Sequence, residues 1–181
     1  DLLWLRQKGL EKAILALAAS GTPVLGICGG YQMLGRSLFD PNGVEGPAGR
    51  SLTGLGLLDC ETVFAPQKTR TRVACRFEKA DGFWGCLAGA EASGYEIHMG
   101  RTDSPRPLCR VWGQFEGGPA PHGEGAFRGN VAGCYLHGLF EEGQALRRLA
   151  HALFEAKGLS APAFGPDHRA QRARQLDLLA D

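Results

Sequence analysis

One short stretch, residues 24–32, limits the possible folds of this chain more than any other, because an apolar run there ends in a cysteine beside glycines. Val24-Leu25-Gly26-Ile27 has the pattern of a strand buried on both faces in a parallel sheet. A helix is expected directly after it, from about Gly30 to Leu38. A strand that turns sharply into a helix strains the intervening residue and projects its side chain above the sheet edge. Glycines at 26, 29 and 30 would relieve the crowding. The stretch therefore predicts a nucleophile elbow that carries Cys28 as a catalytic thiol.

This placement would also activate the sulfur of Cys28. The thiolate is the reactive form, and the pKa of a free cysteine is about 8.5. The positive end of a helix dipole lowers that value and favours the anion. The backbone N–H of Gly29 would then point to where an oxyanion develops on an attacked carbonyl. No second donor for that oxyanion is evident in this stretch.

A thiol nucleophile needs a base, and His137 fits this role best. It closes a candidate parallel strand, residues 131–136, and the carboxyl ends of parallel strands are where functional sites gather. Gly138 after it lets the chain turn away. His98 competes for the same role. The three other histidines lie in a glycine-rich loop or in polar helical stretches, and we expect no catalytic role for them.

Composition narrows the class of protein. With a formal net charge of +1, the chain is not expected to bind nucleic acid or a membrane surface by charge attraction.

The cysteines suggest neither metal binding nor an oxidising location. None of the six forms a C-x-x-C pair or a local cluster with histidine, so a metal site is not expected. Neither a signal peptide nor a long apolar run is present, which indicates a reducing, cytoplasmic location. The chain starts at Asp1 inside an expected helix, so we expect an excised piece of a longer protein.

The order of expected elements predicts an α/β fold with a mostly parallel central sheet and helices on both faces. A length of 181 residues suggests one domain over residues 1–181. Helices are expected at residues 1–19, 141–157 and 167–179. Strands are expected at residues 55–64, 71–77, 94–100, 109–115 and 130–136.

The elbow and four later stretches resemble the class I, or triad-type, glutamine amidotransferases, and more narrowly their cobyric acid synthase branch. The Gly-Tyr-Glu-Ile-His-Met-Gly stretch is the most diagnostic of them. The resemblance covers residues 1–158. The stretches that carry it, in the order in which the family has them, are Gly26–Gly35, Asp40–Gly46, Gly54–Leu58, Gly94–Thr102 and Gly133–Phe140.

The resemblance implies a flavodoxin-like three-layer fold and the hydrolysis of L-glutamine to glutamate and ammonia. Cys28 would form a γ-glutamyl thioester and His137 would shuttle the proton, while Gly29 and Gln32 would bind glutamine or its oxyanion. This domain would need no cofactor. Ammonia would pass to an N-terminal synthetase domain that uses ATP and Mg²⁺ to amidate carboxylates of a corrinoid, adenosylcobyrinic acid a,c-diamide.

The sequence departs at one point from many class I members and at another from the whole cobyric acid synthase enzyme. Many class I members have His-x-Glu at the catalytic histidine, whereas Leu139 stands two residues after His137 here, as in the cobyric acid synthase branch. A Cys28–His137 dyad is therefore expected, with a carbonyl, a water or Glu96 as its third member. No P-loop occurs in the sequence, so the synthetase half is expected to lie outside it.

Two other functions remain open at this point. One is a related amidotransferase with another acceptor, such as a cell-wall lipid intermediate or the substrate of the earlier a,c-diamide step. The other is a thiol hydrolase or a non-catalytic domain of the same sheet type, because a fold alone does not fix a function.

Overall fold

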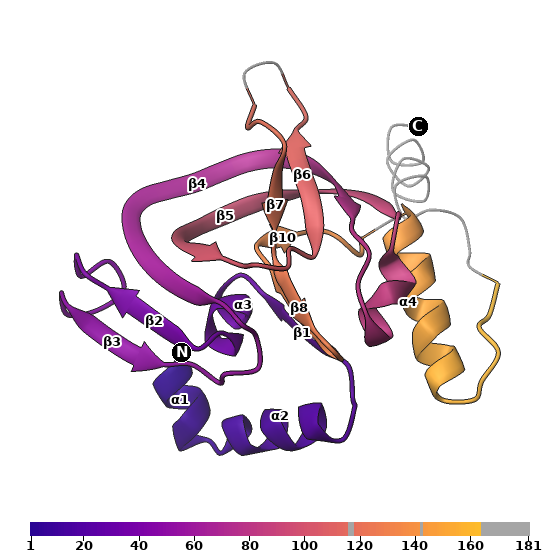
Figure 1. Ribbon diagram of the computed structural model, residues 1–181, viewed down its shortest axis with the longest axis horizontal. Coiled ribbons are helices and arrows are strands. Elements are labelled where there is room, and N and C mark those ends of the chain that lie inside the picture. The colour runs from indigo at the N-terminus through magenta and orange to yellow at the C-terminus, as the bar shows by residue number, and fades with distance from the viewer. Residues whose placement is uncertain (116–117, 142, 164–181) are drawn as a thin grey trace, which may run out of the picture.

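A computed structural model of the chain describes residues 1–115, 118–141 and 143–163 (Figure 1). The elements alternate between short helices and strands of very unequal length. In chain order they are α1 (Leu2–Gln7), α2 (Leu10–Ala19), β1 (Val24–Ile27), α3 (Gly29–Leu34), β2 (Ser37–Asp40), β3 (Arg50–Thr53), β4 (Glu61–Phe77), the 3-10 helix η1 (Gly82–Leu87), β5 (Glu91–Asp103), β6 (Cys109–Gly113), β7 (His122–Glu124), β8 (Ala126–Arg128), β9 (Val131–Cys134), β10 (Leu136–His137) and α4 (Gly143–Ala156).

The strands form two sheets. The smaller has the order β1-β9-β8, with β1 parallel to β9 and β8 antiparallel to it. The larger has the order β10-β5-β4-β2-β3, and β6 and β7 extend it from β4. Among the described strands, only the pairs β1·β9 and β2·β4 are parallel. The expected α/β fold is confirmed, but the sheets are mixed rather than mostly parallel.

A long antiparallel ribbon accounts for most of this difference. The strand expected at residues 55–64 begins only at Glu61, and it continues without a break into the strand expected at 71–77, so the two form one strand, β4. The strand expected at 94–100 is the middle of β5. Strands β4 and β5 curve together across the top of the molecule (Figure 1). Their register shifts between Phe64 and Thr69, in the interval between the two expected strands. The chain therefore bends there without leaving the sheet.

The N-terminal helices are shorter than expected. Gly9 has a φ of +72° and divides the helix expected at residues 1–19 into α1 and α2. The helix after Cys28 ends at Leu34 rather than Leu38. Residues 37–40 instead form β2, which pairs with both β3 and β4. Tertiary strand pairing has overridden the local helical pattern there.

The strand expected at residues 130–136 is divided between the two sheets. Its first part is β9, and its end continues into β10, which pairs antiparallel with β5. The strand expected at 109–115 is β6, and the helix expected at 141–157 is confirmed as α4. The helix expected at 167–179 lies outside the described residues.

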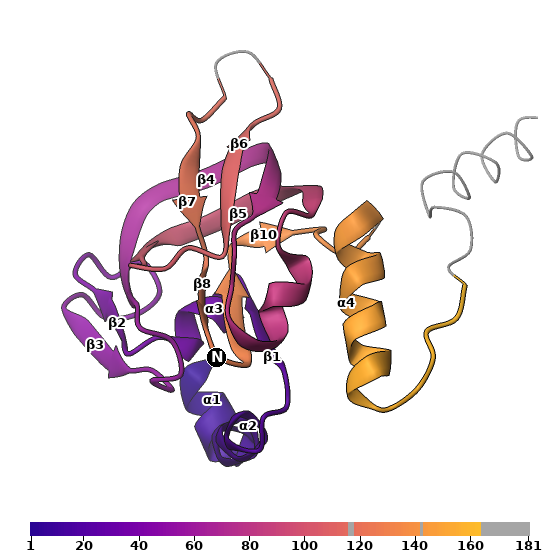
Figure 2. The ribbon, with the colours of Figure 1, turned by 45° about the vertical axis from the view of Figure 1, so that its right-hand side comes forward.

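The helices pack on different sides of the sheets (Figures 1 and 2). Helices α2 and α3 contact β1, while α4 packs against η1 and β5. One buried cluster, which includes Tyr31 and Leu58, lies under α1–α3, and a second, which includes Val73 and Leu136, lies under η1 and α4. Strand β1 is only half-buried, because it pairs with β9 alone among the described strands.

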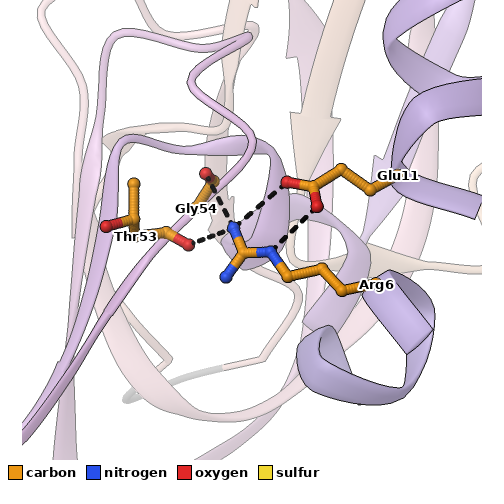
Figure 3. Close-up of polar contacts among 4 residues, drawn as sticks. All are labelled: Arg6, Glu11, Thr53 and Gly54. Atoms are coloured by element: carbon orange, nitrogen blue, oxygen red, sulfur yellow. Dashed lines mark hydrogen bonds and ion pairs between the residues drawn. The ribbon is translucent and has the colours of Figure 1, made fainter. Parts of the chain in front are cut away.

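Hydrogen bonds from Arg6 link the N-terminal helices to the end of β3 (Figure 3). Its guanidinium donates to both carboxylate oxygens of Glu11 at 3.0 and 3.1 Å. It also donates to the carbonyl oxygens of Thr53 at 2.7 Å and Gly54 at 3.4 Å. Such charge-assisted bonds are stronger than neutral ones. They hold α1 beside the strand that forms one wall of the pocket described next.

Candidate active site

The turn from β1 to α3 has the strained geometry that the sequence predicts. Cys28 has φ 54° and ψ −115°, and it is the only residue other than glycine with a positive φ in the part of the chain that the structure describes. Its N–H donates to the carbonyl oxygen of Cys134 at 2.9 Å, and its own carbonyl accepts the N–H of Gln32 at 3.1 Å. Such a backbone costs about 1 to 3 kcal/mol and persists only where its surroundings enforce it. The conformation of Cys28 is therefore held by one hydrogen bond to the residue that ends β9 and by another from α3.

The glycines around Cys28 differ in how much space surrounds them. A Cβ atom on Gly26 would lie 2.7 Å from the backbone of both Gly30 and Tyr31, so only glycine fits there. A Cβ atom on Gly29 or Gly30 would meet nothing within 4 Å. The expectation that all three glycines relieve crowding is thus correct for Gly26 and wrong for the other two. The open space beside Gly29 belongs to a pocket.

This pocket has a volume of about 450 Å³ and is lined by Cys28, Gly29, Gln32 and His98. The half-buried Cys28 thiol donates to the carbonyl oxygen of Ile97 at 3.5 Å. The structure thus gathers three of the four predicted site residues, with the competing histidine, around one cavity. Sequence reasoning assigned no role to the charged residues of the wall, namely Asp1, Glu45, Arg50 and Lys68.

Gln32 links the pocket to a buried polar chain. Its side-chain nitrogen donates to the Tyr135 hydroxyl at 3.2 Å. That hydroxyl lies 2.6 Å from Oγ1 of Thr102, which lies 2.7 Å from Oγ1 of Thr62. A Cβ atom on Gly100 would lie 2.5 Å from the Gln32 nitrogen, so the glycine permits this contact. The amide of Gln32 is therefore held in place before any ligand binds.

His137 lies in β10, beyond the end of the parallel strand that it was expected to close. Cys134 ends that strand, and His137 lies opposite Tyr95 of the neighbouring strand β5. The two rings stack with centroids 5.1 Å apart and an interplanar angle of 5°. Its Nε2 is buried and has no hydrogen-bond partner among the described residues. His137 is not among the residues that line the pocket.

His98 lines the pocket and is held by two contacts. Its Nδ1 lies 2.7 Å from the carbonyl oxygen of Gly100, and its ring stacks on Tyr135 with centroids 3.7 Å apart. Burial lowers the pKa of His98, the Gly100 carbonyl opposes that shift, and a charge on His137 lowers the pKa further. Nδ1 must donate to that carbonyl, so the neutral ring leaves Nε2 as an acceptor. Two imidazoles are thus within electrostatic reach of each other.

Glu96 does not support His137. In the antiparallel register Glu96 faces Leu136, and Tyr95 faces His137. Successive side chains of a strand point to opposite faces of the sheet. The carboxyl of Glu96 therefore lies on the other face from the His137 ring, and the suggestion that it is the third member is wrong.

Another buried carboxyl, that of Glu124, contacts the backbone of Tyr135. Its Oε1 accepts the N–H of Tyr135 at 2.8 Å, whereas its Oε2 is buried without a hydrogen-bond partner among the described residues. Burial, and after it the charge of Glu96, raise the pKa of Glu124 to about 8 against the lowering effect of the Tyr135 and Gly125 N–H groups. Sequence reasoning missed this residue because it follows a glycine-rich stretch.

Within the described residues, no group of three or more His, Cys, Asp or Glu side chains could hold a metal ion. The reactive groups that line the pocket are the Cys28 thiol and the His98 imidazole, and His137 lies within electrostatic reach of His98.

Known proteins resemble this chain over most of its length. The family model described as a CobB/CobQ-like glutamine amidotransferase domain matches residues 1–145. Cobyric acid synthases from Ruminiclostridium cellulolyticum and Rhodobacter capsulatus are 42% and 46% identical to this chain, and both alignments cover all of it. They cover 36% and 34% of those proteins, so the chain spans about a third of the length of these curated relatives.

A solved structure of a glutamine amidotransferase from Thermotoga maritima is also similar, with a TM-score of 0.43 and 16% identity. The similarity covers 86% of this chain and 58% of that one, and it is too distant to carry a conclusion.

Alanine substitutions at Gly26 and Gly29 should have different effects on stability. Gly26→Ala should lower the free energy of unfolding by about 1 to 3 kcal/mol, because its methyl group meets backbone atoms that cannot move independently. Gly29→Ala should leave stability unchanged, because its methyl group enters open space. Urea denaturation of both variants and the parent measures this. Equal stability of the two variants would contradict the assigned packing.

Glu124→Gln should remove a pH dependence of stability. A folded-state pKa of about 8, above the ordinary value of 4.5, means that the folded chain binds more protons than the unfolded chain between those values. The free energy of unfolding therefore falls as pH rises through this range. Glutamine keeps an oxygen for the Tyr135 N–H but cannot ionise.

Urea denaturation at about pH 5 and about pH 8 should show a fall, on the order of a few kcal/mol, in the parent and a smaller one in the variant. Glu78→Gln, at an exposed position, is the matched control and should behave as the parent. An unaltered fall in the Glu124 variant would rule out this carboxyl as its source.

Proposed function

The chain belongs to the CobB/CobQ-like glutamine amidotransferase domain family, and on that premise we propose that Cys28 is the nucleophile with which it hydrolyses L-glutamine. The observation that carries this proposal is the strained backbone of Cys28, at a strand-to-helix turn in the wall of a pocket. Strain of this kind, held by surrounding hydrogen bonds, is typical of residues positioned for chemistry.

The proposed reaction runs through a thioester. The Cys28 thiol first gives its proton to an imidazole, which becomes an imidazolium. The thiolate then attacks the side-chain amide carbon of glutamine, and the resulting oxyanion accepts a hydrogen bond from the Gly29 N–H. The intermediate collapses when the imidazolium protonates the leaving nitrogen, which releases ammonia and leaves a γ-glutamyl thioester. Water then attacks the thioester, and glutamate leaves as the thiol recovers its proton.

We assign the proton shuttle to His137. The stretch Gly133–Phe140 around His137 resembles the family's stretch that holds the catalytic histidine, and this supports the choice over His98. Nε2 of His137 has no hydrogen-bond partner among the described residues, so it can accept a proton. The Tyr95 ring stacks on the imidazole and fixes its plane. With Glu96 on the opposite face, we propose a Cys28–His137 dyad whose orientation comes from this stacking rather than from a carboxylate. Gln32, held by Tyr135, would line the bound glutamine.

We further propose that the released ammonia is used to amidate carboxylates of a corrinoid, adenosylcobyrinic acid a,c-diamide. This proposal rests on the curated relatives, which bear the name cobyric acid synthase and are about three times as long. The ATP and Mg²⁺ for that step would be bound by a synthetase domain, and this domain would need no cofactor. If another acceptor, but not the corrinoid, increased glutamine hydrolysis in the presence of the synthetase domain and ATP, the assignment would move to that acceptor.

The proposed location is the reducing cytoplasm. All six cysteines are free thiols, which agrees with a compartment that keeps thiols reduced. No helix in the described ranges is both long and apolar enough to cross a membrane.

Substitutions at the thiol and at the two imidazoles test the proposed roles. Cys28→Ala should abolish glutamine hydrolysis, because no other thiol and no hydroxyl group among the described residues lines the pocket. His137→Asn should lower kcat by about 10²- to 10⁴-fold, the range that a lost general base produces. His98→Asn should cost much less, because its Nδ1 mainly holds the Gly100 carbonyl.

Ammonia release from glutamine is the measurement, with circular dichroism to verify folding. Hydrolysis retained in Cys28→Ala would refute the proposed function. A larger loss in His98→Asn than in His137→Asn would transfer the role of base to His98.

A further inference from the structure

The loop between β2 and β3 brings two opposite charges to the Cys28 pocket. Glu45 lies in the middle of this loop and Arg50 at its end, and both line the cavity together with the thiol. Arg50 is half-buried and Glu45 is exposed. The sequence pattern of this loop indicated family membership but no role for either side chain.

The loop is ordered by the chain itself. The Asp40 carboxylate accepts the N–H groups of Val44 and Glu45, both at 2.8 Å, and the Asp40 carbonyl accepts the N–H of Gly49 at 2.7 Å. The N–H of Arg50 donates to the carbonyl oxygen of Pro47 at 3.2 Å. Glu45 and Arg50 are therefore presented from a fixed backbone, which lowers the entropy cost of binding a ligand between them.

Neither charge is neutralised by the protein. Across the described ranges, the ion pairs involve Arg6, Arg36 and Arg106, and none involves Glu45, Arg50 or Lys68. A half-buried guanidinium has lost part of its hydration, and this is unfavourable unless an anion compensates. The pocket therefore offers an unpaired cation and an unpaired anion, beside a nucleophile.

We propose that Arg50 binds the α-carboxylate of glutamine and that Glu45 binds its α-ammonium group. This inference rests on the proposed glutaminase function and adds what selects the substrate. Glutamine carries both charges on its α-carbon, two methylene groups away from the amide that Cys28 attacks. The β2–β3 loop presents a free anion and a free cation to the cavity of the thiol, and together they match that zwitterion and exclude uncharged amides. The other two charged residues of the wall, Asp1 and Lys68, come from segments far apart in the chain.

Arg50 suits the carboxylate better than Lys68, the other cation of the wall. A guanidinium is a planar fork that can donate two parallel hydrogen bonds to a carboxylate, whereas an ammonium is a point charge. Lys68 is exposed and lies in the irregular segment of β4 between Phe64 and Thr69. Arg50 is half-buried and is the first residue of β3.

Two electrophiles that react with the same thiol separate substrate recognition from thiol reactivity. 6-Diazo-5-oxo-L-norleucine carries the α-ammonium and α-carboxylate of glutamine, and iodoacetamide carries neither. In Arg50→Gln and in Glu45→Gln, the second-order rate of Cys28 labelling by the diazo-ketone should fall about 10- to 100-fold, the range expected for one charged hydrogen bond. Labelling by iodoacetamide should not change.

Conservative and distant variants complete the design. Arg50→Lys should recover part of the loss, because it keeps the charge and loses the fork. Arg110→Gln, at an exposed position of β6, should label like the parent with both reagents. Lys68→Gln should have little effect.

The outcomes distinguish this inference from the function on which it rests. If the parent chain reacts with iodoacetamide but not with the diazo-ketone, the glutaminase proposal fails. If the parent reacts with both and the Arg50 and Glu45 variants keep the parent rate with the diazo-ketone, only this inference is overturned. It is also overturned if Lys68→Gln alone slows the diazo-ketone, or if the Arg50 and Glu45 variants lose reactivity toward both reagents equally.

Discussion

The backbone of Cys28 is the constraint on which the rest of the site depends. Its positive φ is held by the hydrogen bond from its N–H to Cys134 and by the bond that its carbonyl accepts from Gln32. The first bond continues the parallel ladder between β1 and β9, and the second begins α3. Gly26 allows α3 to lie directly against β1. Because a strand, a helix and a glycine all fix this turn, the thiol is aimed into the pocket without help from a ligand.

The two sheets meet where this turn ends. The chain leaves β9 at Cys134 and enters the larger sheet at β10, so His137 arrives beside β5, the strand whose Ile97 carbonyl contacts the thiol. Gln32 reaches Tyr135 in the crossing segment and through it the threonines of β4 and β5. The pocket therefore lies where the two sheets adjoin. Cys28 follows β1 of the smaller sheet, whereas the candidate bases His98 and His137 belong to the larger sheet.

The sequence predicted the features that depend on neighbouring residues. The turn at Cys28 follows from the glycines and the apolar run beside it, and α4 follows from its helical pattern. It could not predict features set by distant pairing. Strand β4 contains Pro66 at its irregular segment, which locally suggests a break, yet pairing with β5 holds it in the sheet. The antiparallel register between β10 and β5 places Glu96 on the sheet face opposite to His137. That register cannot be read from the residues around either position. Glu45 and Arg50 gain significance only once Asp40 folds their loop.

The central claim is that Cys28 alone carries the γ-glutamyl group during glutamine hydrolysis. The direct measurement is to mix the chain with L-glutamine, quench the reaction in acid and locate acylated cysteines by peptide mass spectrometry. Of the six cysteines, the account predicts a γ-glutamyl thioester on Cys28 only. A γ-glutamyl group on another cysteine, or glutamine turnover with every thiol unmodified, would contradict it.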